Sequence, residues 1–145
     1  KLVTKRVKDS YDYIIIDCAP TYSALTTIAL NTTQAVLIPM ISDSFGVHGT
    51  KLMKEVLKEH NYDFGITPKI IGVVFMLWDG KANQVSQSTR IIKEWDASMI
   101  FQARISKNNW YRVANGQRIS ISNSRAHQKY KKEFREFVAE FQRRV

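Results

Sequence analysis

Residues 11 to 17 most constrain how this chain can fold. An aromatic residue and three consecutive isoleucines, Ile14 to Ile16, lead directly to Asp17. A run this apolar is typical of a strand that is buried on both faces inside a parallel sheet. Because Pro20 prevents the strand from continuing, we expect Asp17 at the carboxyl end of a central strand. Open α/β sheets bind their ligands at that edge.

The residues around Asp17 admit three interpretations. Asp17 caps a turn, or it is a Walker B aspartate that holds a magnesium ion through water beside a nucleotide phosphate, or it is the phosphoacceptor of a receiver domain. The third interpretation requires a lysine at the end of a later strand, and the strands that end near Met40 and Trp78 supply none at that place. The first two interpretations stay open.

Strands and helices alternate along the rest of the chain. Such alternation implies crossover connections and a mostly parallel sheet flanked by helices, which is an α/β fold. Apolar runs predict strands over 35–40, 69–78 and 99–105, and the last, shorter and more alternating, is expected nearer the sheet edge. Helical spacing and capping residues predict helices over 22–31, from Asp43 or Ser44 onward, over 82–96, over 110–115 and over 126–144.

The same patterns predict which side chains face the core. Pro39 is expected to mark the end of its strand. The last helix carries an aromatic stripe whose helical period favours core packing over a platform for stacked bases. The expected inward faces are Phe45, Leu52, Met53, Val56 and Leu57 in the second helix, Val85, Ile92 and Trp95 in the third, and Tyr130, Phe134, Phe137, Val138 and Phe141 in the last.

Length and composition indicate one domain over residues 1–145. The chain is 44% hydrophobic and long enough for a core of its own. Its single cysteine, Cys18, cannot form an internal disulfide, which suits a cytoplasmic protein. We expect no membrane-spanning segment and no signal peptide.

Positive charge is concentrated in the second half of the chain. The formal net charge is +9, yet residues 1–80 hold 8 Lys and Arg against 8 Asp and Glu, whereas residues 81–145 hold 14 against 5. A one-sided basic surface is expected for a partner that is a polyanion, with nucleic acid ahead of an anionic membrane. A solvated surface that only aids solubility is the other interpretation.

Several segments together resemble a known family. They are residues 11–20, the helix that follows, residues 35–39, the helix that opens near 45–49, residues 71–74, the turn at 79–83 and the strand and loop at 105–108. Their order and spacing resemble the ParA/Soj chromosome and plasmid partition ATPases, which are deviant Walker A proteins related to MinD. The resemblance implies an incomplete P-loop NTPase fold. It also implies that Asp17 is the Walker B aspartate, which holds Mg²⁺ through water, and that Pro20 lies in the switch segment after it.

The phosphate loop of that family has no counterpart in these residues. Such a loop needs closely spaced glycines followed by a lysine and a serine or threonine. Only sixteen residues precede Asp17, and the pair Gly80 and Lys81 lacks the rest of the motif. We therefore expect weak or absent ATP and Mg²⁺ binding and no ATP hydrolysis by this chain alone. We interpret it as the carboxyl-terminal part of a ParA-like ATPase domain, from a truncated gene, a degraded copy or an expression fragment.

The resemblance implies a role in DNA segregation. ParA-like proteins dimerise with ATP, coat DNA without sequence preference and respond to a ParB-like protein at a centromere-like site, so the expected location is the bacterial nucleoid, on a chromosome or plasmid. Asn108 is expected beside the nucleotide base, although the usual Pro-Arg-Asn triplet is here Ser-Lys-Asn. The expected DNA-binding residues are Lys81, Lys107, Arg112, Arg118, Lys129, Lys131, Lys132 and Arg135.

Two alternatives belong to other functional classes. The first is a binding module without catalysis, either an orphan DNA-binding domain or a regulatory subunit that pairs with an intact ATPase. The second is a MinD-like protein that attaches to membranes through its last helix. Because the sheet needs that helix as a cover, we rank DNA above membrane.

Overall fold

A computed structural model describes residues 8–18 and 23–145 of the chain. Its strands are β1 (Ala35–Ile41), β2 (Lys69–Trp78) and β3 (Ile100–Ser106). Its α-helices are α2 (Ala24–Leu30), α3 (Ser44–Phe64), α4 (Ala82–Glu94), α5 (Trp110–Gly116) and α6 (Gln128–Arg144). Short 3₁₀ helices span Lys8–Ser10, Ala97–Met99 and Ile121–Asn123.

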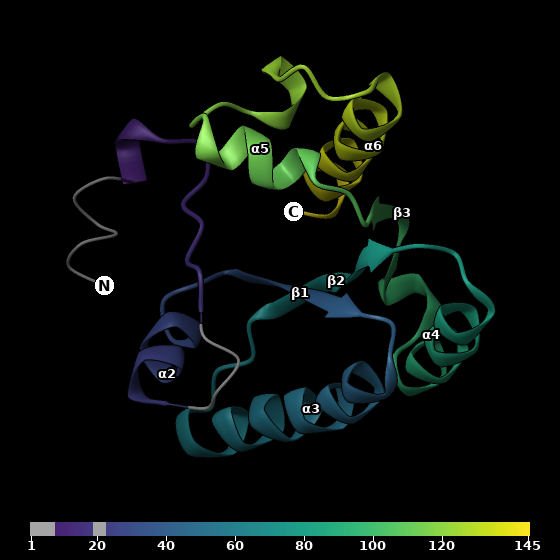
Figure 1. Ribbon diagram of the computed structural model, residues 1–145. Helices are drawn as coiled ribbons and strands as arrows, with labels where there is room; N and C mark the ends of the chain where they lie inside the picture. Colours follow the sequence, from purple (N-terminus) through teal and green to yellow (C-terminus); the bar gives the residue numbers. More distant parts are fainter. Residues whose placement is uncertain (1–7, 19–22) are drawn as a thin grey trace.

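The strands form one parallel sheet in the order β1-β2-β3. Figure 1 shows α5 and α6 on one side of this sheet and α2, α3 and α4 on the other. The predicted α/β class, with a parallel sheet flanked by helices, is therefore confirmed. The prediction that the 99–105 strand lies nearer the edge is also confirmed, because β3 is the last strand of the described sheet.

Local sequence signals fix most element boundaries. Asp43 caps α3 as predicted, its side chain accepting a 2.7 Å hydrogen bond from the Gly46 amide. The same helix ends at Gly65, whose φ of 62° suits a residue without a Cβ. β2 spans the predicted residues, and α2 ends before Asn31 as expected.

Two apolar clusters cover the two faces of the sheet. On one face, Phe75 and Val73 of β2 pack with Leu57 of α3 and Ile91 of α4. On the other face, Val74 packs with Phe101 and Ile105 of β3 and with the aromatic side chains of α6. The prediction that the aromatic stripe of α6 is core is confirmed, since Phe137 and Phe141 contact this second cluster and Phe134 contacts a third around Ala114.

The predicted inward faces of α3 and α4 are partly wrong. Phe45 and Leu52 are exposed at 87% and 49%, while Thr50 and His60 of the same helix are fully buried. In α4, Val85 is exposed and Ile91 is fully buried. Helical spacing alone leaves the angle of a helix about its own axis free, and packing against the sheet sets that angle.

Pro39 lies within β1 and does not end it. It pairs in register with Val74, two residues before the strand ends at Ile41. Since β1 is an edge strand of the described sheet, a residue without a backbone N–H is tolerated there.

Residues 11–18 form no strand, which overturns the prediction of a buried central strand. Ile14, Ile15 and Ile16 are exposed at 43%, 85% and 42%, and Asp17 is also exposed. In Figure 1 this segment runs beside the sheet, from the level of α5 down to α2. The Tyr13 ring packs edge-on against Phe141 at 5.7 Å. A strand requires a neighbour for its backbone groups, and no described segment pairs with this one.

Candidate functional site

The carboxyl ends of β2 and β3 bring two of the predicted cations to one edge of the sheet. The Lys107 amide, just after β3, donates a 2.9 Å hydrogen bond to the Trp78 carbonyl, which ends β2. Lys81 follows three residues after Trp78. Because parallel strands end at the same edge, the turn that carries Lys81 and the loop that carries Lys107 start side by side.

The turn after β2 is held in a fixed shape. Leu77 and Gly80 have positive φ values of 52° and 73°. The Gln84 side chain donates to the Leu77 carbonyl at 3.0 Å and accepts from the Asp79 amide at 2.7 Å. The ammonium of Lys81 lies 3.6 Å from the Asp79 carboxylate, and its side chain is 80% exposed. Lys81 is therefore accessible, with part of its charge balanced by Asp79.

The Asn108 amide is engaged by its own loop. Its Nδ2 donates to the Ser106 carbonyl at 3.0 Å, and its Oδ1 accepts from the Trp110 amide at 2.8 Å. These bonds shape the connection from β3 into α5. The prediction that Asn108 contacts a nucleotide base is not tested by this geometry.

One exposed arginine lies in α5, beside α6, and a second lies two residues after the end of α5. Tyr111 packs against Phe134 of α6 at 6.4 Å between ring centroids, which places α5 over the amino-terminal half of α6. Arg112 lies next to Tyr111, and Arg118 follows the helix with a φ of 54°. Both arginines are exposed, and neither has a carboxylate partner among the described residues.

The first turns of α6 lie close to Lys107. Glu133 accepts hydrogen bonds from the Ser106 hydroxyl at 2.8 Å and from the Ser106 amide at 3.3 Å. Lys129 lies 4.0 Å from the same Glu133 carboxylate. Hence Lys129 and Lys107 flank one acidic side chain at the carboxyl edge.

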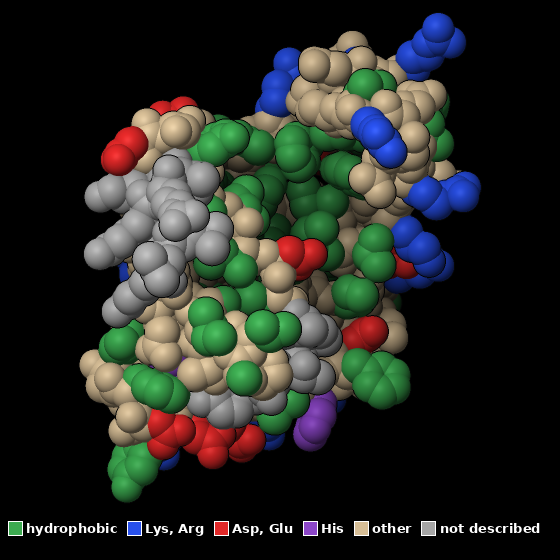
Figure 2. Space-filling view, turned by 90° about the vertical axis from the view of Figure 1, so that its left-hand side faces the viewer, with side chains coloured by type: hydrophobic (Ala, Val, Ile, Leu, Met, Phe, Trp, Pro, Cys, Tyr) green, Lys and Arg blue, Asp and Glu red, His purple; other side chains and the backbone are tan. Residues whose placement is uncertain are grey.

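The remaining predicted cations lie on α6. Lys132 pairs with Glu136 at 3.8 Å, and Arg135 donates from Nε to the Lys131 carbonyl at 3.3 Å. Figure 2 shows Lys and Arg side chains standing out at the upper end and along one margin of the molecule, at the level where Figure 1 places α5 and α6. The structure thus places the predicted cations on α5, on α6 and in the loops at the carboxyl edge, with Lys107 and Lys129 both next to Glu133.

Burial of Tyr111 changes its acid strength. Desolvation, with the nearby negative charge of Glu133, raises the pKa of Tyr111 to about 12. Its hydroxyl is buried and has no hydrogen-bond partner among the described residues. The phenol therefore stays neutral and serves packing.

The described residues do not make a complete nucleotide and magnesium site. Asp17 is exposed, and the described part of the chain holds no group of three His, Cys, Asp or Glu side chains able to hold a metal ion. Pro20 lies outside the described residues. The role of Asp17 as a magnesium-site residue stays a prediction, and no catalytic step is derived through it.

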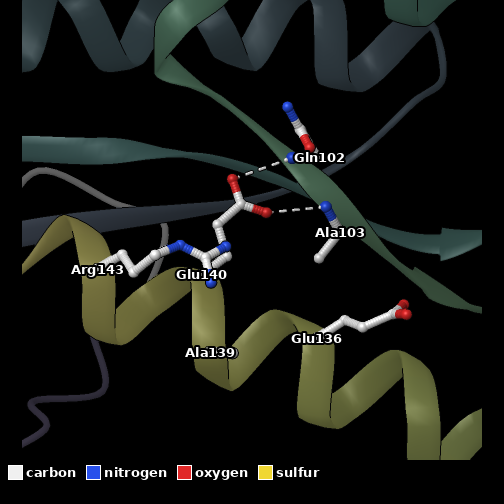
Figure 3. Close-up of a pocket in the computed structure, with 6 residues that line it drawn as sticks. All are labelled: Gln102, Ala103, Glu136, Ala139, Glu140 and Arg143. Carbon is white, nitrogen blue, oxygen red and sulfur yellow. Dashed lines mark hydrogen bonds between the residues drawn. The ribbon is translucent and has the colours of Figure 1, made fainter.

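A shallow pocket between β3 and α6 is lined by a carboxylate that is already satisfied. Figure 3 shows Glu140 reaching from α6 to the backbone of β3, and its oxygens accept from the Gln102 amide at 3.1 Å and the Ala103 amide at 2.9 Å. The same carboxylate binds Arg144. We therefore assign Glu140 to holding α6 on the sheet edge.

Arg104 of β3 was not predicted from the sequence. Its guanidinium carbon lies 4.0 Å from the centroid of the Trp78 ring, at the same carboxyl edge. The available signal was that Arg104 is the one charged residue within β3.

Comparisons with known proteins agree with this fold. A family model described as an AAA domain matches residues 1–66. The chromosome-partitioning ATPase Soj of Treponema pallidum is 27% identical over 143 residues, covering 96% of this chain and 56% of the relative. The sporulation initiation inhibitor protein Soj of Bacillus subtilis is 27% identical over 108 residues, covering 74% of this chain and 43% of the relative.

A solved structure shares the fold. The complex of a Cyanothece McdA variant with ATP superposes with a TM-score of 0.81 at 20% identity, covering 96% of this chain and 55% of that chain. The match shows that this chain shares the α/β fold of that structure. Within its sequence relatives, the chain is similar to the Soj-type chromosome-partitioning ATPases. It spans about half the length of the relatives that it matches.

Proposed function

We propose that this chain contributes the DNA-facing surface of a ParA-like partition protein and binds duplex DNA without sequence preference. The observation that carries this proposal is the set of exposed cations on α5, on α6 and in the loops next to them. Arg112, Arg118 and Lys107 have no carboxylate within ion-pair distance among the described residues. Unpaired cations neutralise DNA phosphates at lower cost than cations that must first leave a partner.

The relatives support this role. The Treponema relative is a chromosome-partitioning ATPase, and the resemblance of residues 11–108 to its family supports a role in DNA segregation for this chain. We propose residues 1–145 as one domain, the carboxyl-terminal part of a ParA-like ATPase domain, associated with the nucleoid. No helix in the described ranges has the length and apolar character needed to cross a membrane.

We propose that this chain dimerises with ATP only when a phosphate loop is present. An intact ATPase that pairs with this chain, or residues joined to it, would supply that loop. Asp17 then acts as the magnesium-site aspartate, and a ParB-like centromere-binding protein stimulates hydrolysis. By itself, this chain should bind ATP weakly or not at all and should not hydrolyse it, because its residues contain no phosphate-loop motif.

Fluorescence anisotropy with two unrelated DNA duplexes over a series of salt concentrations tests the DNA proposal. We expect equal affinity for both duplexes and a steep loss of affinity with salt. The variants Lys107→Glu and Arg112→Glu should weaken binding to both duplexes alike. Lys58→Glu is the matched control, because Lys58 is exposed on α3, across the sheet from α5.

Two results would contradict the proposal. The first is an equal DNA affinity of the variants Lys107→Glu, Arg112→Glu and Lys58→Glu. Lys107 and Arg112 would then contribute no more to DNA binding than a cation elsewhere on the surface. The second is strong flotation with anionic liposomes without DNA retention, which would favour the MinD-like alternative. Against that alternative, Phe137 and Phe141 are already packed on the sheet.

A further inference from the structure

Two arginines stack on aromatic rings at opposite ends of β3, and they differ in how their N–H groups are used. The guanidinium of Arg144 lies 4.3 Å from the Phe101 ring centroid and donates to the carbonyls of Ile71, Ser98 and Ile100. It also pairs with a carboxylate on its own helix at 2.7 Å. This arginine is structural, since its donors are satisfied within the chain.

Arg104 has the same stacking and none of the partners. Its guanidinium carbon lies 4.0 Å from the Trp78 ring centroid and 5.9 Å from that of Phe75. The residue is exposed, and no hydrogen-bond acceptor or carboxylate engages its guanidinium among the described residues. Stacking uses the flat face of a guanidinium and leaves the N–H groups at its rim free for a forked contact with phosphate.

The backbone of β2 is irregular near its end, and this irregularity places Trp78 next to Arg104. Strict alternation along β2 would place Phe75 and Trp78 on opposite faces, yet both belong to the same apolar cluster. Leu77 between them has a φ of 52°, which changes the alternation. A leucine in this conformation is strained, and such strain persists where the surrounding structure requires it.

Arg104 shares the carboxyl edge with Lys81 and Lys107, although its stack on Phe75 and Trp78 lies on the face of the sheet that α3 and α4 cover. Trp78, on which it stacks, accepts the backbone hydrogen bond of Lys107 and precedes Lys81 by three residues. One carboxylate, that of Asp79, pairs with Lys81 in this neighbourhood. The carboxyl edge therefore presents Arg104 and Lys107 as cations without an acidic partner in the described part of the chain.

We propose that Arg104 binds a backbone phosphate of duplex DNA and that Trp78 positions it. This inference rests on the proposed function and adds a residue that the family resemblance did not indicate. Trp78 acts through Arg104, because the guanidinium covers one face of its ring and Phe75 lies 5.9 Å away at a tilt of 35°. A guanidinium that is already held in place loses less side-chain entropy on binding.

Salt-dependent anisotropy on single variants tests the inference. Arg104→Ala should weaken binding about tenfold on unrelated duplexes and lower the salt slope by about one. Arg104→Lys should keep the wild-type slope with intermediate affinity, because it keeps the charge but loses the fork. Trp78→Leu should also keep the slope while affinity falls. Arg90→Ala is the matched control, since Arg90 is exposed near the other end of α4.

The outcomes separate this inference from the proposed function. If Lys107→Glu and Arg112→Glu weaken binding but Arg104→Ala behaves as Arg90→Ala, the role of Arg104 is wrong and the DNA surface stands. If the wild-type chain binds no duplex, both are wrong. Thermal unfolding followed by circular dichroism checks that each variant is folded, and a Trp78→Phe variant replaces Trp78→Leu if the latter is not.

Discussion

The carboxylate of Glu140 accepts a 2.7 Å hydrogen bond from Arg144, one turn later on α6. Glu140 also accepts hydrogen bonds from two backbone N–H groups of β3, and Arg144 donates to the carbonyls of Ile71 in β2 and Ile100 in β3. One ion pair therefore fastens the last helix to two strands. The basic surface on that helix depends on this attachment.

Glu140→Gln should destabilise the fold by about 2 to 3 kcal/mol, because it leaves one buried donor unsatisfied and Arg144 without its counter-charge. Urea unfolding followed by circular dichroism measures the change. Glu136→Gln is the control, since Glu136 is exposed and its pair with Lys132 lies on the surface. Equal midpoints for the two variants would contradict the assigned role of Glu140.

The same carboxylate should make stability depend on pH. Burial raises the pKa of Glu140, but the amides of Ala103 and Gln102 and the charge of Arg144 outweigh burial, so its pKa lies below the ordinary value of 4.5. A lowered folded-state pKa means that the stabilisation is present above the unfolded-state pKa and is lost as pH falls through the folded-state value. The gap in urea midpoint between wild type and Glu140→Gln should therefore narrow in acid. A gap that stays constant into strong acid would contradict this linkage.

Gly72 allows β2, β3 and α6 to approach one another. Its φ is 143°, and a Cβ there would lie 2.3 Å from the Met99 carbonyl oxygen and 2.9 Å from a nitrogen of Arg144. Gly72→Ala should cost about 3 kcal/mol, because backbone must move. Gly49→Ala is the matched control: nothing lies within 4 Å of its added Cβ, and the helix should gain about 1 kcal/mol. A thermal scan that ranks the two variants in the opposite order would refute this packing.

Tyr111→Phe should leave stability unchanged or raise it by up to about 1 kcal/mol, since the buried hydroxyl has no partner among the described residues. The raised pKa, about 12, adds an alkaline effect. Stability linked to a raised pKa is present below the unfolded-state value of 10 and is lost as pH rises towards the folded-state value. The wild type should therefore lose stability above pH 10 more steeply than Tyr111→Phe, as urea midpoints would show.

Much of the fold could be predicted from local patterns. The bounds of β2 follow from ten residues that are nearly all apolar, and the start of α3 follows from the capping side chain of Asp43. These signals act over a few residues and need no distant partner. The grouping of Lys107 with Lys129 also follows once parallel strands and a covering helix are inferred.

Features that depend on distant contacts could not be predicted. The stack of Arg104 on Trp78 requires the positive φ of Leu77 and an irregular register between β2 and β3. The hydrogen bonds that Glu140 accepts from two neighbouring amides of β3 also join distant parts of the chain, so local patterns do not predict them. The isoleucines before Asp17 predict a buried strand because they are apolar. An apolar composition does not show whether a neighbouring segment is present to cover these side chains.

The last prediction concerns Ile15, which the sequence pattern predicts to be buried and which the structure shows exposed. It is 85% exposed, whereas Ile71 of β2 is 4% exposed. Ile15→Ser should therefore change the free energy of unfolding by less than about 0.5 kcal/mol. Ile71→Ser, the matched substitution, should cost about 3 kcal/mol or more through lost burial and a buried hydroxyl. Urea midpoints of the two variants give the comparison. An equal loss in both would mean that residues 14–16 are covered in solution, by a strand or a second copy of the chain.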